Sequence, residues 1–182
     1  MSELTGILDL SIQNYGEKIC ISDKKQCLTY LELERNIHRT AFALRLKDIK
    51  PGVHVALLME NCVEYLILYF SLLKMGVVMV PIDFTSGTDR IKFILEDCNI
   101  HTLIVRKDSE GTYMGKCSVL EAASLISSQQ EADNFPSVNE SDTACIMYTT
   151  GSTGNPKGVV LTHANVFASL NNITQYMGYT DT

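Results

Sequence analysis

The pattern of apolar and polar positions predicts helices and strands from the start of the chain. Apolar residues recur at helical spacing over residues 4–12 and predict an amphipathic N-terminal helix. Two β-prone runs, 19–22 and 26–29, are separated by three charged residues and predict a hairpin. Thr29, with Glu32 three positions later, has the form of a capping box that opens a second helix. The buried face of that helix is expected to comprise Leu33, Ile37, Ala41 and Leu44.

From residue 53 onward, short apolar runs alternate with helical patterns. Strands are expected over 53–58, 77–82 and 101–105, with helices over 62–75 and 89–98. The run at 53–58 is apolar throughout, which is typical of a strand covered on both faces of a parallel sheet. This alternation predicts an α/β fold, a mostly parallel sheet with helices on both faces, with residues 1–105 as its alternating α/β core.

The periodicity weakens over residues 106–142, which we expect to form an irregular connection. A helix is predicted within it over 118–128, followed by a polar surface linker over 129–140 that contains Pro136. Regular structure is predicted again over residues 143–182. There a strand at 143–148 leads into a glycine-rich loop, and a second strand at 158–161 leads into a helix that Thr162 caps.

Composition narrows the possible partners and location of the 182-residue chain. Its formal net charge of -6 argues against a nucleic-acid partner, because such a surface repels a phosphate backbone. The longest apolar run, 65–73, is about half the length that spans a bilayer, so we expect no membrane insertion. The six cysteines form no C-x-x-C pair, and no metal site is predicted. No secretory leader is recognisable at 1–15, and a cytoplasmic location is expected.

The glycine-rich segment 148–158 lies between two predicted strands and has the composition of a phosphate-binding loop. Glycines let backbone N–H groups converge on clustered oxygens, and small hydroxyl side chains add donors. Lys157 adds a positive charge that reaches the terminal phosphates, and Pro156 stiffens the backbone beside it. The residues predicted to bind ATP phosphates are Thr149, Thr150, Gly151, Ser152, Thr153, Gly154 and Lys157.

This loop differs from the common P-loop. In that motif a G-K-[ST] sequence opens a helix, whereas here Lys157 lies between Pro156 and Gly158 and a strand is predicted next. The sequence therefore predicts a phosphate loop between two strands, and a GTPase or nucleotide-kinase interpretation fails.

The eleven residues YTTGSTGNPKG at 148–158, followed by VLTHAN at 160–165, resemble the signature of the adenylate-forming superfamily. This superfamily includes acyl-CoA synthetases, luciferases and the adenylation domains of peptide synthetases. The segments LTYLEL at 28–33 and LKMGVVMVPID at 73–83 are similar to scaffold motifs of the same enzymes. Residues 1–182 thus resemble the N-terminal part of an AMP-binding (adenylation) domain.

The resemblance implies a two-step reaction with ATP and Mg²⁺. A small-molecule carboxylic acid is activated as an acyl-adenylate, and the acyl group then passes to the thiol of CoA or of a carrier protein's phosphopantetheine. Lys157 is expected to stabilise the leaving pyrophosphate. In the resembled enzymes the adenine site, the acyl pocket and a C-terminal lysine follow the signature, so these 182 residues are expected to be inactive alone.

Two features depart from the resembled pattern. Thr150 stands where serine is usual, a change that keeps the hydroxyl donor. Residues 84–87 lack the proline-rich turn common in peptide-synthetase members, which weakens an amino-acid-activating assignment.

A non-catalytic role is the alternative. The chain would then be a truncated module that binds a nucleotide or a partner through an exposed apolar face. That face would contact the missing C-terminal portion of the same enzyme or a second copy. His163 and Asp83 are interpreted as structural residues at a helix start and a strand end.

Overall fold

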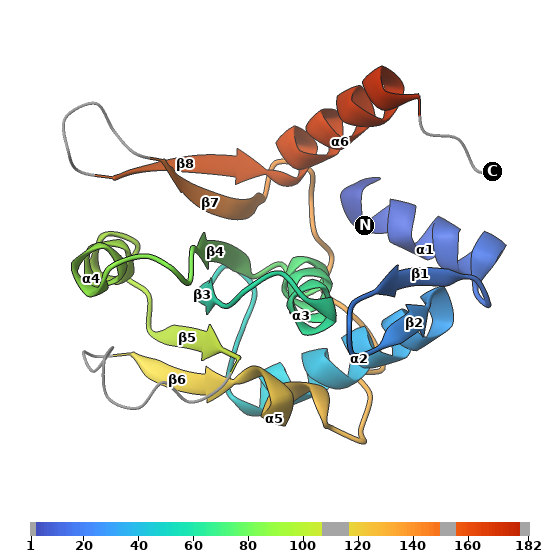
Figure 1. Ribbon diagram of the computed structural model, residues 1–182, viewed down its shortest axis with the longest axis horizontal. Helices are drawn as coiled ribbons and strands as arrows, with labels where there is room; N and C mark the ends of the chain where they lie inside the picture. The colour runs from blue at the N-terminus through green and yellow to red at the C-terminus, as the bar shows by residue number, and fades with distance from the viewer. Residues whose placement is uncertain (1–2, 107–116, 150–155, 179–182) are drawn as a thin grey trace.

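The computed structural model describes residues 3–106, 117–149 and 156–178. It contains a six-stranded sheet in the order β6-β5-β3-β4-β7-β8 and a separate hairpin, β1–β2 (Figure 1). The strands are β1 (Ile19–Ser22), β2 (Cys27–Thr29), β3 (His54–Leu58), β4 (Val78–Ile82), β5 (Thr102–Val105), β6 (Ser118–Glu121), β7 (Thr143–Thr149) and β8 (Lys157–Thr162). The helices are α1 (Glu3–Tyr15), α2 (Tyr30–Leu46), α3 (Val63–Lys74), α4 (Thr88–Asp97), α5 (Ala122–Ile126) and α6 (His163–Met177).

The five strands from β6 to β7 run parallel, and β8 returns antiparallel to β7. This arrangement confirms the predicted α/β class with a mostly parallel sheet. It also confirms that the signature loop joins two strands, since β7 and β8 flank it directly.

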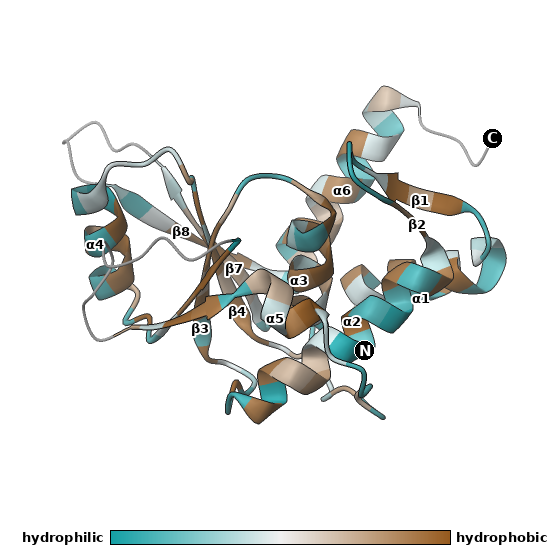
Figure 2. Ribbon diagram, turned by 60° about the horizontal axis from the view of Figure 1, so that its bottom comes forward, coloured by the Kyte–Doolittle hydropathy of each residue, from teal (hydrophilic) through white to brown (hydrophobic). Residues whose placement is uncertain are grey.

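Side chains of β3 alternate between two apolar layers, as the period of a strand requires. Val55 and Leu57 pack with α2, α3 and α5, whereas Ala56 and Leu58 pack with α4. Helices therefore cover both faces of the parallel part of the sheet (Figure 2). The four residues from Val55 to Leu58 are buried, so the predicted strand with two covered faces is confirmed.

Local signals fixed the start of α2 as predicted. The Thr29 hydroxyl accepts a hydrogen bond from the Glu32 N–H at 3.2 Å, and the Glu32 carboxylate accepts one from the Thr29 N–H at 2.8 Å. This reciprocal pair is a complete capping box, which satisfies two N–H groups that the first helical turn leaves without partners. The four residues expected on the buried face, Leu33, Ile37, Ala41 and Leu44, are all buried.

One element differs from the prediction. The helix expected over 118–128 is only five residues long, and the residues before it form the strand β6. Ser118 to Glu121 extend because they pair with Thr102 to Val105 of β5, a long-range interaction that periodicity does not report. In the polar stretch that follows, Ala132 and Val138 are buried, so that stretch is held against the helices at these two points.

Candidate functional site

The β7–β8 hairpin carries the predicted phosphate loop. Thr149 and Lys157 are partners in the last register position of the hairpin, so they face each other at the base of the loop. Both are exposed, which leaves the hydroxyl and the ammonium accessible to a ligand. Of the other predicted phosphate-binding residues, Thr150, Gly151, Ser152, Thr153 and Gly154 lie outside the described residues.

The preceding register position pairs Tyr148 with Gly158. A Cβ atom at Gly158 would lie 3.2 Å from Cζ of Tyr148 and 3.1 Å from Cγ2 of Ile146. These distances are shorter than ordinary van der Waals contact, so the tyrosine ring occupies the space that a larger residue would need. Gly158 therefore serves close packing at the loop base.

The Tyr148 hydroxyl reaches the end of α4. It donates a hydrogen bond to the Asp97 carboxylate and lies 3.2 Å from Sγ of Cys98. Burial and, after it, the hydrogen bond to Asp97 raise the pKa of Tyr148 well above its usual value. The phenol therefore keeps its proton and remains a donor.

A cavity of 360 Å³ lies at the carboxyl ends of β3 and β4, beside β7. Its lining includes Asn61, Asp83, Phe84 and Tyr148. Ligands of α/β proteins bind at this edge of a parallel sheet, so the cavity and the loop base form one candidate region.

Asp83 holds a turn at this edge. Its carboxylate accepts hydrogen bonds from the Thr85 N–H at 2.9 Å and the Thr85 hydroxyl at 2.8 Å. These bonds lower the pKa of Asp83 and keep it ionised. The geometry agrees with the structural interpretation, because the carboxylate closes an Asx turn.

His163 is the first residue of α6 and is only 1% exposed. Its backbone N–H donates a hydrogen bond to the backbone carbonyl of Asp142 at 3.0 Å, next to the Thr162–Asn165 capping box. Burial lowers the pKa of the imidazole, which Asp142 opposes only in part. These contacts agree with a packed residue at a helix start.

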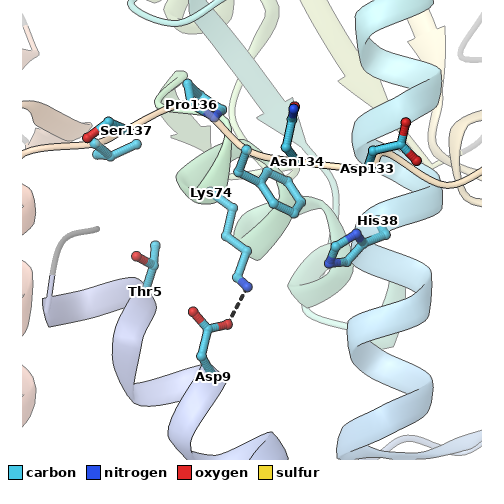
Figure 3. A pocket seen from close by; sticks show the side chains of 10 residues that line it. Thr5, Asp9, His38, Lys74, Asp133, Asn134, Pro136 and Ser137 are labelled. Carbon is cyan, nitrogen blue, oxygen red and sulfur yellow. Dashed lines mark hydrogen bonds and ion pairs between the residues drawn. The ribbon is translucent and has the colours of Figure 1, made fainter.

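A second cavity, of 480 Å³, lies between α1, α2, α3 and residues 133–138 (Figure 3). The Lys74 ammonium forms an ion pair with Asp9 and lies 5.4 Å from the centre of the Phe135 ring. Its side chain is 8% exposed, so it is charged but buried and compensated by both neighbours. Figure 1 draws α1 and α2 on the right, away from α4, with α3 between them. The ion pair joins α1 to α3 and so belongs to packing between the helices.

Within the described ranges, no helix has the length and apolarity needed to cross a membrane. Over the same ranges, no three His, Cys, Asp or Glu side chains cluster in a way that would hold a metal ion.

Comparison with known proteins identifies relatives along almost the whole chain. The family model described as AMP-binding enzyme matches residues 8–182. Gramicidin S synthase 2 from Brevibacillus brevis is 32% identical over 180 residues, which are 97% of this chain and 4% of that protein. Feruloyl-CoA synthase from Amycolatopsis sp is 36% identical over 143 residues, which are 76% of this chain and 29% of that protein.

A solved structure is also similar to most of this chain. The N-terminal subdomain of Klebsiella oxytoca NpsA, in complex with 3-hydroxybenzoyl-AMSN, matches with a TM-score of 0.81 at 30% identity. The match covers 90% of this chain and 41% of the NpsA chain, so these residues span less than half of each relative described. With the family model covering nearly every residue and the signature at the turn between β7 and β8, the chain belongs to the family of AMP-binding, adenylate-forming enzymes.

Proposed function

We propose that this chain is the ATP-phosphate-binding part of an enzyme that activates a small-molecule carboxylic acid as an acyl-adenylate and passes the acyl group to a thiol. The observation that carries the proposal is the pairing of Thr149 with Lys157 at the end of the β7–β8 hairpin. A hydroxyl and an ammonium, exposed side by side at a glycine-rich turn, suit a polyanionic ligand.

In the first half-reaction, a carboxylate oxygen of the acid attacks the α-phosphorus of ATP. An acyl–phosphate bond forms, the bond from the α-phosphorus to the bridging oxygen breaks, and pyrophosphate leaves with the electron pair. Negative charge grows on that leaving group, so the Lys157 ammonium stabilises the transition state more than the ground state. Thr149 and the loop hydroxyls add hydrogen bonds to the same oxygens.

Mg²⁺ fits this site as a companion of the triphosphate. The exposed Thr149 hydroxyl is an oxygen ligand of the kind that Mg²⁺ accepts. When bound, the ion supplies neutralisation of phosphate charge.

In the second half-reaction, the sulfur of a thiol attacks the acyl carbon and AMP leaves. The thiol is that of CoA or of the phosphopantetheine on a carrier protein. The relative named feruloyl-CoA synthase supports the first acceptor. The similar solved structure of NpsA-ThdA, an artificially fused adenylation–PCP di-domain from Klebsiella oxytoca, supports the second.

The test is carboxylate-dependent exchange of labelled pyrophosphate into ATP. We expect exchange from a full-length enzyme that contains this chain and none above background from the 182 residues alone. The adenine and acyl sites that the resemblance implies lie beyond the signature. Exchange by the isolated chain would overturn the proposed inactivity, and its absence in the full-length enzyme, over a broad panel of acids, would overturn the proposed reaction.

An interaction role is a second candidate, favoured by apolar side chains exposed on neighbouring elements. These are Met147, Val159 and Val160 on the hairpin and Leu170, Ile173, Tyr176 and Met177 on α6. Exposed apolar side chains of this kind associate with the remainder of the same enzyme or with a second copy. Light scattering tests the second-copy form, which predicts a dimer that Val160→Asp with Ile173→Asp converts to monomer.

A reducing, cytoplasmic location is part of the proposal. All six cysteines are free thiols, and burial raises the pKa of Cys145 and so suppresses its thiolate.

A further inference from the structure

The outer half of the β7–β8 hairpin has little of the sheet to hold it. The register between β4 and β7 joins Met79 to Cys145, near the start of β7. Beyond that point Ile146 is still buried in the apolar layer of α4, but the side chains of Met147, Val159 and Val160 are exposed. The base of the predicted phosphate loop therefore lies at the end of a two-stranded ribbon, and such ribbons are only marginally stable by themselves.

Tyr148 connects this ribbon to the body of the fold. Its ring packs over Gly158 on the neighbouring strand, and its hydroxyl donates to Asp97 at the end of α4. Figure 1 draws the outer end of the hairpin above α4, and the contact joins two residues that are 51 positions apart in sequence. The residues on either side of the loop, Thr149 and Lys157, are each one position from this contact.

Asp97 occupies a position that the helix alone disfavours. It is the last residue of α4, its side chain is exposed, and no basic residue shares the last turn. A carboxylate there faces the negative end of the helix dipole and weakens the helix. A charge-assisted hydrogen bond from Tyr148 to this carboxylate offsets the loss of helix stability.

We propose that Tyr148 and Asp97 are positioning residues that fix the base of the phosphate loop and thereby the separation of Thr149 and Lys157. This inference rests on the proposed function of the loop in ATP binding. Gly158 contributes to the same contact, because only a residue without a side chain lets the tyrosine ring lie across β8 and reach α4. The helix α4 is thus coupled to the site through its last residue.

Hydrogen exchange of the isolated chain tests the anchor without any activity. In Tyr148→Phe the ring stays and the hydroxyl is lost, so we expect amide exchange at 147–149 and 157–159 to accelerate about tenfold. Exchange in β3 and β4 stays unchanged. The matched control is Tyr176→Phe, which removes an exposed hydroxyl on α6 and leaves hairpin exchange as it was. Equal exchange in wild type and Tyr148→Phe would overturn the proposal.

Variants of Asp97 test the other partner of this hydrogen bond by the same measurement. Asp97→Leu is expected to match the effect of Tyr148→Phe, and the double variant to add little, because both remove one shared bond. Asp97→Asn keeps an acceptor oxygen and restores most of the protection. If Asp97 served α4 alone, removing its charge would stabilise the helix and leave hairpin exchange untouched, which would contradict a positioning role.

The effect on the use of ATP is measured in the full-length enzyme. There Tyr148→Phe is expected to raise the KM for ATP about tenfold and leave the KM for the carboxylic acid unchanged. Loosened hairpin exchange with an unaltered KM for ATP would refute the link to the phosphate loop. If the wild-type enzyme does not use ATP at all, the proposed function fails, while the exchange data still decide whether the anchor exists.

Discussion

The strand β3 and the outer half of the β7–β8 hairpin belong to one sheet but lie in opposite environments. Val55 in β3 is fully buried, with helices on both sides of its strand, whereas Val160 in β8 is 56% exposed. Stability is concentrated where both faces of the sheet are covered. The predicted chemistry is concentrated where the sheet is bare, and there a few specific contacts replace bulk burial.

Identical substitutions in the two regions give the largest predicted contrast. Val55→Ala is expected to lower the free energy of unfolding by about 2–3 kcal/mol, through lost burial and an unfilled cavity. Val160→Ala is expected to change it by less than about 0.5 kcal/mol. Chemical denaturation of both variants measures the difference. Similar losses would show that the hairpin is as much a part of the core as β3.

A methyl group added at Gly158 tests how tightly the loop base is packed. Gly158→Ala crowds Tyr148 and Ile146 and is expected to cost about 1–2 kcal/mol of unfolding free energy. In a Tyr148→Ala background the cost of the same substitution is expected to fall by about half, because the contact with the ring is gone while the contact with Ile146 remains.

The control for Gly158 is Gly6 in α1, where a Cβ atom would meet nothing within 4 Å. Gly6→Ala is expected to stabilise the chain by about 0.5–1 kcal/mol through helix propensity. The two glycine substitutions thus have opposite predicted signs. A stabilising effect at Gly158 would contradict the packing described at the loop base.

A pH dependence of stability is predicted from His163. Burial lowers its pKa in the folded chain, so the unfolded chain takes up the proton first as the pH falls. The neutral imidazole contributes its stability above about pH 6.5, and this is lost as the pH falls toward the folded value. Between pH 8 and 5 the free energy of unfolding is expected to fall less steeply in His163→Gln than in the wild type. The two slopes are expected to differ by at most about 1.4 kcal/mol per pH unit. Equal slopes in the wild type and His163→Gln would contradict the lowered pKa of His163.

Local patterns predicted most elements because their causes are local. The capping box at Thr29 and the apolar run of β3 involve neighbours in sequence, and both are present as predicted. The strand β6 was wrongly assigned to a helix because its conformation depends on β5, across residues 106–117.

The candidate site shows the same division. The composition of the loop identified Thr149 and Lys157, and the structure places them opposite each other. The hydrogen bond between Tyr148 and Asp97 was not predicted, because it joins residues that are 51 positions apart. The one available signal was local, an aromatic residue before the loop and a glycine after it.

The central claim is that the hairpin carries the chemistry while the core carries the stability. Lys157→Ala in the full-length enzyme tests it most directly, with Lys50→Ala, another exposed lysine, as the control. We predict that pyrophosphate exchange falls about a hundredfold in Lys157→Ala with the unfolding midpoint unchanged. Unaltered exchange, or a loss that follows a lowered unfolding midpoint, would contradict the account.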